Sequence, residues 1–545
     1  MQKESEIKVS SIYKGKHSKG DKFTQNHYLI LEELNSGVFK VLKLNKSTAG
    51  VRQNKTLIAA LPFNFKAGGC AFYSDELAIE NIKHNSLLAE DPVEISAAEF
   101  DKILRDIVKF TAGIHYSCIT AKKKSSYIPV SGKIIDNKEL SKMIDSSLDM
   151  WLTTGRFENE FRDKLTKFLN VKYSAIVNSG SSANLLAIAA LTSEELKDRR
   201  LKSGDEIITI AAGFPTTIAP IIQNNLIPVF VDAKIPSYNI DESQIERAVT
   251  SKTKAIFAAH TLGNPFNIEA VTKIAEKYNL WVIEDNCDAL GSKYNGKHTG
   301  TFGDISTFSF YPAHHITSGE GGAVCMRKAD LYKIILSLRD WGRDCWCDTG
   351  KDNSCRRRFT QQFGHLPAGY DHKYVYSRLG YNLKMTDWQA AIGSAQADKL
   401  NNFIKKRKHN FNYLYSKLKK FENNLILPES EKHAEPCWFG FPITTRKNTD
   451  KFGLVKFLED NGIGTRQLFA GNILKQPVFT QNHFKLRILD SKFLYSNKLN
   501  SGDYSKLPNT DRIMTSTFWL GVFPGLTDGN FDYIADKFRE YFNKV

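Results

Sequence analysis

From about residue 155 to residue 330, short apolar runs alternate with helix-length segments. The runs are rich in β-branched residues, as buried strands are; they include "DEIITIAA", "IPVFVDA", "KAIFAAH", "LWVIED" and "ISTFSFY". The segments between them, such as "NIEAVTKIAEKYN", space their apolar residues as an amphipathic helix does. This alternation predicts an α/β fold with a large, mostly parallel sheet that helices cover on both faces. Ligand sites in such sheets lie at the carboxyl ends of the strands.

The rest of the chain has different patterns. Near the N-terminus, "HYLILEEL" and "GVFKVLKL" surround a turn-like "NSG" and predict a small β-rich module. After the sheet region, a helix-rich stretch leads into a smaller α+β region. We therefore expect three parts: an appendage of unknown role over residues 1–100, a large domain over 101–409 and a small C-terminal domain over 410–545.

Composition indicates the setting of the protein. With 41% hydrophobic and 25% charged residues, the 545-residue chain is typical of soluble globular proteins. No apolar run is long enough to span a membrane, and the first residues lack the apolar core of a signal peptide, so we expect a cytoplasmic protein without a membrane partner. The net charge of +16 favours anionic partners. The basic runs at 122–124 and 356–358 are interpreted as solvated faces, and we expect no nucleic-acid partner.

Three strand ends carry residues that suit a planar, phosphorylated cofactor. "NSGSSANLLA" places Gly180 and Ser181 between a strand and a helix, where backbone N–H groups bind phosphate. Asp285, in "WVIEDNCDALG", is suited to pair with a ring nitrogen, and Phe214, in "AAGFPTTIAP", offers a stacking face. Taken singly, these motifs are as typical of a capped helix, of the exposed end of a strand and of a core phenylalanine.

The segment "SFYPAHHITSGEGGAV" has the small residues, aromatic ring and glycine turn of a site whose lysine binds pyridoxal phosphate (PLP), but His314 and His315 stand at its centre. Together with the motifs above, with "HTLGNP" and with "GYNLKMTDWQAA", it resembles the DegT/DnrJ/EryC1/StrS sugar aminotransferase family. The resemblance runs from about residue 100 to the C-terminus. It implies the fold-type I architecture of PLP-dependent enzymes.

The resemblance also implies roles for single residues. The internal lysine of the family aligns with His314, and Ser309 aligns with a serine that contacts the cofactor phosphate. Asn382 aligns with an asparagine that reaches the phosphate of the neighbouring subunit, which implies a homodimer with shared active sites. Asp288 stands where most members have a glutamine near the ring hydroxyl, and this departure leaves its role open.

A histidine in place of the lysine is a feature of the sugar 3-dehydratases of the family, which use pyridoxamine phosphate (PMP). Imidazole cannot form the imine that lysine forms, so the amine of the cofactor condenses with a 4-keto sugar instead. His314 is then expected to take a proton from the C4′ carbon of the cofactor, since imidazole titrates near neutrality. The C3 hydroxyl leaves. A purely structural histidine is the alternative.

Eight cysteines in a chain of this length do not indicate a disulfide scaffold. Four of them follow the spacing C-x57-C-x-C-x7-C: Cys287, Cys345, Cys347 and Cys355. The last three lie in a loop over residues 343–358, where simpler family members have a shorter connection. The spacing is similar to that of the dehydratase branch that carries a [2Fe–2S] cluster, which requires four thiolates. A zinc site with the same ligands is the alternative.

That branch acts on CDP-4-keto-6-deoxyglucose in the synthesis of 3,6-dideoxyhexoses for the lipopolysaccharide O-antigen. An NADH-dependent flavin and iron–sulfur reductase delivers single electrons through the cluster, and the product is a 3-deoxy sugar. The rival hypotheses are a nonenzymatic regulator with the same fold, a dehydratase without a cluster and an aminotransferase. The presence of acid, base and cluster ligands disfavours the regulator. The cysteine spacing disfavours the dehydratase without a cluster, and His314 disfavours the aminotransferase.

Overall fold

The computed structural model describes residues 26–35, 38–45, 94–96, ten residues between 101 and 116, 127–347 and 349–544. The chain divides into two compact units, residues 1–123 and 124–545. In the first unit, three strands form an antiparallel sheet in the order β1-β2-β3. These strands are β1 (Asn26–Asn35), β2 (Val38–Asn45) and β3 (Glu94–Ser96). The two strands predicted in the N-terminal module are therefore confirmed.

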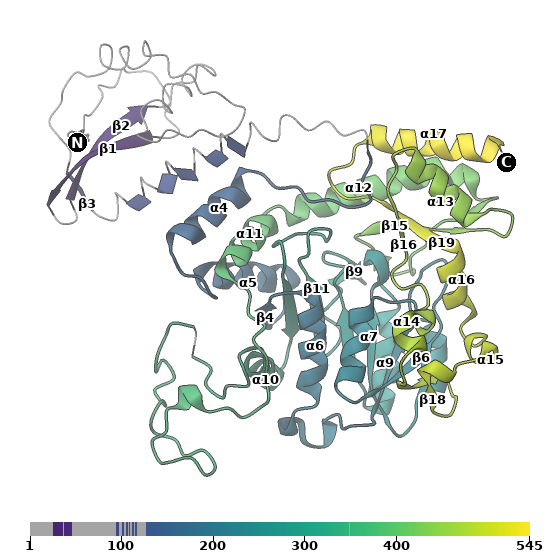
Figure 1. Cartoon of the computed structure of the whole chain (residues 1–545), viewed down its shortest axis with the longest axis horizontal. Helices are drawn as coiled ribbons and strands as arrows, with labels where there is room; N and C mark the ends of the chain where they lie inside the picture. Colours follow the sequence, from purple (N-terminus) through teal and green to yellow (C-terminus); the bar gives the residue numbers. More distant parts are fainter. Residues whose placement is uncertain are drawn as a thin grey trace, which may run out of the picture. The chain divides into compact units, whose positions relative to one another are not determined.

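The second unit is built on a nine-stranded sheet in the order β18-β17-β6-β5-β7-β8-β11-β12-β4. In Figure 1, the labels of β4 and β11 lie to the left and those of β6 and β18 to the right. Neighbours from β17 to β11 run parallel, whereas β18, β12 and β4 pair antiparallel at the two sides. The strands are β4 (Tyr173–Val177), β5 (Glu206–Ile210), β6 (Ile227–Val231), β7 (Thr253–Ala259), β8 (Trp281–Asp285), β11 (Ile305–Ser309), β12 (Gly322–Met326), β17 (Lys485–Ile488) and β18 (Leu494–Tyr495). The predicted α/β fold with a mostly parallel sheet is confirmed.

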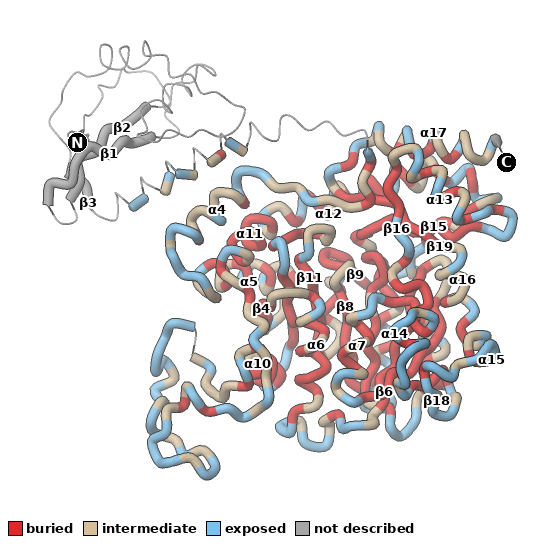
Figure 2. Tube along the Cα trace, in the orientation of Figure 1, coloured by how far each residue is buried: buried red, intermediate tan, exposed pale blue. Residues whose placement is uncertain are grey.

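Successive residues of the central strands enter two separate cores, one on each face of the sheet. In β5, Ile207 packs in the core that contains Leu186 of α6, and Ile208 packs in the core that contains Val271 of α9. Because both faces are covered, the central strands are buried along their length (Figure 2). The helices of the unit are α4 (Asn137–Leu148), α5 (Arg156–Leu169), α6 (Gly180–Leu191), α7 (Pro215–Gln223), α8 (Ile245–Ala248), α9 (Ile268–Tyr278), α10 (Ala329–Arg339), α11 (Asp387–Ala397), α12 (Leu400–Leu418), α13 (Lys451–Asp460), α14 (Pro477–Thr480), α15 (Ser501–Tyr504), α16 (Pro508–Ser516) and α17 (Asp528–Lys544). Within the described residues, no helix is both long and apolar enough to cross a membrane.

The C-terminal region forms a second, four-stranded antiparallel sheet in the order β13-β15-β19-β16. Its strands are β13 (Leu425–Ile426), β15 (Gly440–Thr445), β16 (Thr465–Gln467) and β19 (Thr517–Gly521), and three short strands elsewhere are β9 (Lys293–Tyr294), β10 (Lys297–His298) and β14 (Ala434–Glu435). Helices α12, α13 and α17 share a core with this sheet, as a smaller α+β region does. One strand from the same region, β17, instead pairs with β6 of the large sheet. The domain boundaries near residues 100 and 410 stay predictions.

Helix α11 shows how a cap positions the segment before it. Thr386 and Gln389 form a capping box at its start. Asp387, which follows Thr386, accepts hydrogen bonds from the N–H groups of Gly155 at 3.0 Å and Glu158 at 2.9 Å, and thereby caps α5. Gly155 has no side chain with which to cap α5 itself, so the carboxylate of Asp387 supplies this role from a distant part of the chain. The segment that contains Asn382 is thus tied to the start of α5.

Candidate active site

The turn from β4 to α6 forms one side of the site. The Ser179 hydroxyl caps α6 by accepting the Ser182 N–H at 3.0 Å. N–H groups in the first turn of a helix lack acceptors within the helix and attract anions. Gly180 lies against Ser309, the last residue of β11: a β-carbon on Gly180 would lie 2.5 Å from that of Ser309. The structure therefore brings Ser309 to the turn that carries Gly180 and the exposed Ser181.

Asp285 ends β8, and its buried carboxylate is held by three donors. Oδ2 accepts the Asn184 amide at 3.0 Å and the Thr217 hydroxyl at 2.8 Å, and Oδ1 accepts the Cys287 N–H at 3.0 Å. Asn184 lies in α6 and Thr217 in α7, and sequence reasoning identified neither. The sequence signal that could have identified them is a polar side chain in the first two turns of a helix that follows a strand.

Glu284, the neighbouring carboxylate, is satisfied inside the fold. It accepts the N–H groups of Gly300 at 2.7 Å, Phe302 at 2.9 Å and Gly303 at 2.7 Å, and it lies 3.1 Å from Nε2 of His260. Burial by itself raises its pKa, but His260 and these N–H groups outweigh burial and hold the pKa below the usual range. Of the two carboxylates at this strand end, Asp285 is therefore the one suited to a ligand.

His314 lies in the loop after β11. Its Nδ1 is 3.4 Å from Oδ1 of Asp288, and its side chain is 15% exposed. The ring of Phe439 packs against it with centroids 5.2 Å apart, and the Tyr311 ring meets it edge-on at 6.2 Å. The structure thus joins an imidazole, a carboxylate and aromatic rings. Phe439 comes from the C-terminal region, and no motif in the sequence pointed to it.

Two further predicted residues are exposed. Phe214 precedes α7, is 52% exposed and meets the ring of Phe469 edge-on at 6.0 Å. Asn382 is also exposed, in a segment that forms a β-bridge with Asp340. The Asn382 side chain is therefore not packed in the core of its own subunit, and it is accessible to a second chain.

The four cysteines that the spacing groups together are only partly gathered. The thiol of Cys347 interacts with those of Cys345 and Cys355. Burial by itself raises the pKa of Cys347, but hydrogen bonds from Ser354 and Cys355 outweigh it and hold the pKa at about 7. In contrast, Cys287 lies beside the turn from β4, since a β-carbon on Gly180 would be 3.0 Å from its sulfur.

Cys287 also differs from the loop cysteines in its protonation. Burial, together with the carboxylates of Asp285 and Asp288, raises the pKa of its thiol well above the usual range. In the part of the chain that the structure describes, no group of three or more His, Cys, Asp or Glu side chains is arranged to hold a metal ion.

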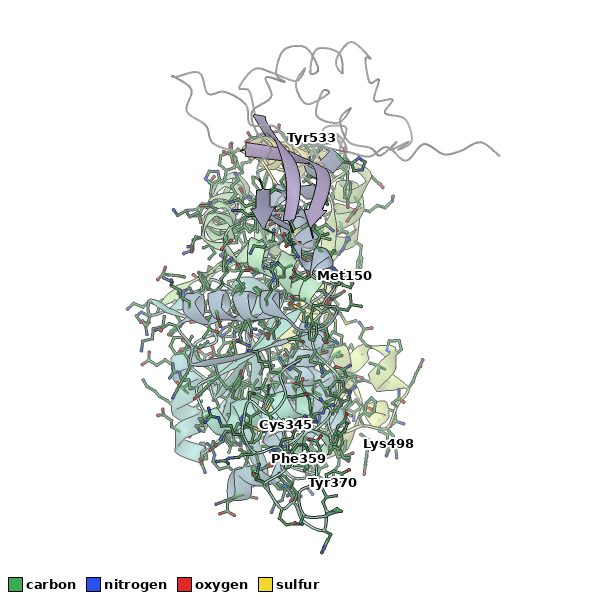
Figure 3. The ribbon with its side chains drawn as sticks, turned by 90° about the vertical axis from the view of Figure 1, so that its left-hand side faces the viewer. Met150, Cys345, Phe359, Tyr370, Lys498 and Tyr533 are labelled. Carbon is green, nitrogen blue, oxygen red and sulfur yellow. The ribbon has the colours of Figure 1, made fainter. Side chains whose placement is uncertain are left out.

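Two residues that follow the cysteine loop pair with residues near its two ends, and exposed aromatic rings lie in the loop and directly after it. Asp371 pairs with Arg358 at 2.7 Å, and His372 lies 2.7 Å from Asp344. Phe359, 55% exposed, is labelled with Cys345 in Figure 3. In the basic run at 356–358, Arg356 and Arg357 are exposed, as predicted for a solvated face. The other basic run, at 122–124, lies outside the described residues.

The sequence profile of the DegT/DnrJ/EryC1/StrS aminotransferase family matches residues 133–539. A lipopolysaccharide biosynthesis protein named RfbH from Salmonella typhimurium is 56% identical over 420 residues, which cover 77% of this chain and 92% of that protein. A dTDP-4-dehydro-2,6-dideoxy-D-glucose 3-dehydratase from Saccharopolyspora spinosa is 46% identical over 422 residues, which cover 77% of this chain and 87% of that enzyme.

Solved structures with similar folds include sugar dehydratases. A GDP-4-keto-6-deoxymannose-3-dehydratase with bound GDP-perosamine superposes with a TM-score of 0.66 at 29% identity, over 75% of this chain and 99% of that one. The Escherichia coli GDP-4-keto-6-deoxy-D-mannose-3-dehydratase with bound hydrated PLP gives the same TM-score and identity, over 75% of this chain and 98% of that one. The family profile starts after the N-terminal unit, and the similarity to these structures supports the predicted fold-type I architecture.

Proposed function

Because the chain belongs to the DegT/DnrJ/EryC1/StrS aminotransferase family, we propose that it is a CDP-4-dehydro-6-deoxyglucose 3-dehydratase. It would use PMP to remove the C3 hydroxyl of CDP-4-keto-6-deoxyglucose, for the synthesis of a dideoxy sugar of the O-antigen. The observation that carries this proposal is His314, an imidazole beside a carboxylate where an aminotransferase of the family has its lysine. The named relatives, among them 3-dehydratases, support the reaction class.

The residues at the strand ends fit PMP. Gly180 lets Ser309 lie directly against the first turn of α6, so the Ser309 hydroxyl and the N–H groups of that turn are placed to bind one phosphate. Asp285 is fixed by three donors, as a carboxylate that pairs with a ring nitrogen must be, and Phe214 offers an exposed ring for stacking. When bound, PMP supplies a primary amine for the C4 carbonyl of the sugar and a ring that accepts an electron pair.

His314 moves the proton in this proposal. Its imidazole would take the proton from the C4′ carbon of the cofactor and pass it to the C3 hydroxyl of the sugar, which would then leave as water. Asp288, whose Oδ1 lies 3.4 Å from Nδ1, orients the ring. Asn382 would reach the phosphate site of a second subunit in a homodimer.

We further propose that Cys287, Cys345, Cys347 and Cys355 hold a [2Fe–2S] cluster. Three thiols that already interact on one loop are donors of the right kind for iron, and they support the proposal together with the cysteine spacing. When bound, such a cluster accepts and donates single electrons, which a reductase partner using NADH would supply. The exposed loop gives that partner access.

The test of the proposed function is a dehydration assay in ¹⁸O-labelled water. Purified protein is incubated with PMP and with 4-keto-6-deoxy sugars linked to CDP, dTDP or GDP, and ¹⁸O incorporation at C3 is measured by mass spectrometry. We expect incorporation with the CDP sugar. Preference for the dTDP sugar would overturn the assignment of substrate, and formation of a 4-amino sugar with glutamate would overturn the assignment of reaction.

Gly180→Ala tests the phosphate turn. The added β-carbon would lie 2.5 Å from that of Ser309, so one of the two segments must shift. We expect the free energy of unfolding to fall by about 1–3 kcal/mol, as in other overpacked interiors, and PLP binding to weaken. Calorimetry and a PLP titration measure both effects. Gly213→Ala is the matched control, since no atom would lie closer than 3.5 Å to its β-carbon; equal effects of both variants would contradict the prediction.

Removal of residues 1–123 tests the independence of the second unit. The family profile starts at residue 133, and every proposed site residue lies after residue 179. We therefore expect residues 124–545 to form a dimer by light scattering, with the melting temperature, PLP affinity and dehydration rate of the full chain. A folded but inactive fragment would mean that the N-terminal unit contributes to the site.

A further inference from the structure

Arg407, in α12, is a charged side chain buried beneath the site. It is 1% exposed, and in the described part of the chain no ion pair links it to a carboxylate. Its guanidinium instead donates to backbone carbonyls of two segments: Nη1 to those of Trp438 and Phe439 at 3.3 and 3.2 Å, and Nη2 to that of His314 at 3.3 Å. Burial lowers its pKa to about 10, so Arg407 stays charged at neutral pH.

The neighbouring His315 makes a second connection between the same two segments. Its Nε2 lies 2.7 Å from the carbonyl oxygen of Cys437. A carbonyl only accepts hydrogen bonds, so Nε2 carries the hydrogen. Burial, and secondly the charge of Arg407, lower the pKa of His315 well below the usual range, so its ring stays neutral. His315 is therefore neutral, carries its hydrogen on Nε2 and joins the two segments by one hydrogen bond.

Both connections end on the segment 437–439, which supplies the ring that faces the proposed base. Phe439 packs 5.2 Å from the His314 ring and 5.3 Å from that of Trp519. The distance between the rings of His314 and Phe439 thus depends on these two connections, of which the Arg407 guanidinium is the one that bonds to both backbones. Simple packing does not require this arrangement, because an apolar side chain fills a buried site without the cost of burying a charge.

We propose that Arg407 is a positioning residue: its planar fork fixes the His314 backbone against the segment 437–439 and so holds the imidazole at reacting distance. The inference rests on the proposed function for its kinetic consequence, although the geometry stands without it. A lysine at this position would keep the charge. Its single ammonium group lacks the two separated donor nitrogens that reach both segments.

The test compares Arg407→Lys with Arg487→Lys. Arg487 is a second buried arginine, paired with Glu206 at the amino end of β5, on the opposite edge of the sheet from the site. For Arg407→Lys we expect kcat of dehydration, per folded and PMP-loaded enzyme, to fall about 10- to 100-fold with KM unchanged, as misplacement by about 1 Å does. For Arg487→Lys we expect a lower melting temperature and an unchanged kcat.

A second measurement does not depend on turnover. Diethyl pyrocarbonate acylates accessible imidazoles, and mass spectrometry of the peptide that carries His314 gives its rate of modification. We expect faster modification in Arg407→Lys, and an altered circular dichroism band of added PLP, with neither change in Arg487→Lys. A wild-type kcat in Arg407→Lys, or losses that follow only the folded fraction in both variants, would overturn the proposal. A wild-type protein that dehydrates no nucleotide sugar would refute the proposed function, and the modification rates would still decide the role of Arg407.

Discussion

Replacing His314 by asparagine is expected to slow C3 dehydration by about 100- to 10,000-fold, the usual contribution of a general base, and to leave PMP binding unchanged. Asparagine keeps a polar group of similar reach beside Asp288 but cannot take up a proton. The affinity for PMP should persist because Gly180, Ser309 and Asp285, which we assign to the phosphate and the ring nitrogen, are untouched. Incorporation of ¹⁸O at C3 and a PMP titration measure the two quantities separately.

His409→Asn is the matched control for this variant. Its imidazole, in α12, is 49% exposed, lies 2.8 Å from Asp528 and stacks on Tyr413, and neither of these partners is a proposed site residue. We expect wild-type dehydration from this control. Turnover near the wild-type rate in His314→Asn itself would remove His314 from the role of base, whatever the control shows.

Replacing Cys347 by serine is expected to separate the two halves of the proposed reaction. The thiol of Cys347 interacts with those of both other loop cysteines, so its loss should remove the iron, the sulfide and the visible absorption of the cluster. NADH-driven formation of the 3-deoxy sugar should fall to background. Dehydration, measured by ¹⁸O incorporation, should continue at the wild-type rate because it uses His314 and the cofactor alone.

The interpretation of this variant requires an intact fold and a buried-cysteine control. Thermal melting must stay near that of the wild type, since loss of a cluster can also unfold the loop that binds it. Cys325→Ser, in strand β12, changes a buried thiol that lies 3.5 Å from the Ser174 hydroxyl, and it should keep both half-reactions. If folded Cys347→Ser produced the 3-deoxy sugar at the wild-type rate, electrons would not pass through a cluster. A colourless wild-type protein that contains zinc would favour the zinc alternative.

Local sequence signals predicted much of the architecture. The apolar runs at 206–210, 227–231 and 281–285 form the buried strands β5, β6 and β8. Their apolar side chains point to both faces of the sheet, and both faces are covered. In each case the information lies within a few residues of the element that it determines.

The contacts that organise the site join distant parts of the chain and have no such local signal. The carboxylate of Asp285 depends on Asn184 and Thr217, which belong to two earlier helices. Arg407 lies in a helix rich in basic residues, and nothing in its spacing shows that its guanidinium reaches the carbonyl of His314. The fold also puts Cys287 beside Gly180, a contact that the spacing of the cysteines does not indicate.

Strand β17 has a consequence for exchanging parts between related enzymes. It joins the large sheet, but in the chain it lies after β16 and before β19, which are neighbours in the smaller sheet. A single crossover placed between the two sheets would therefore leave one of them with a foreign strand. Chimeras designed to exchange the smaller sheet should take residues 425–467 and 517–544 from one parent together, and β17 from the parent that supplies β6. For this protein, recombination must respect the sheets rather than the linear order of the chain.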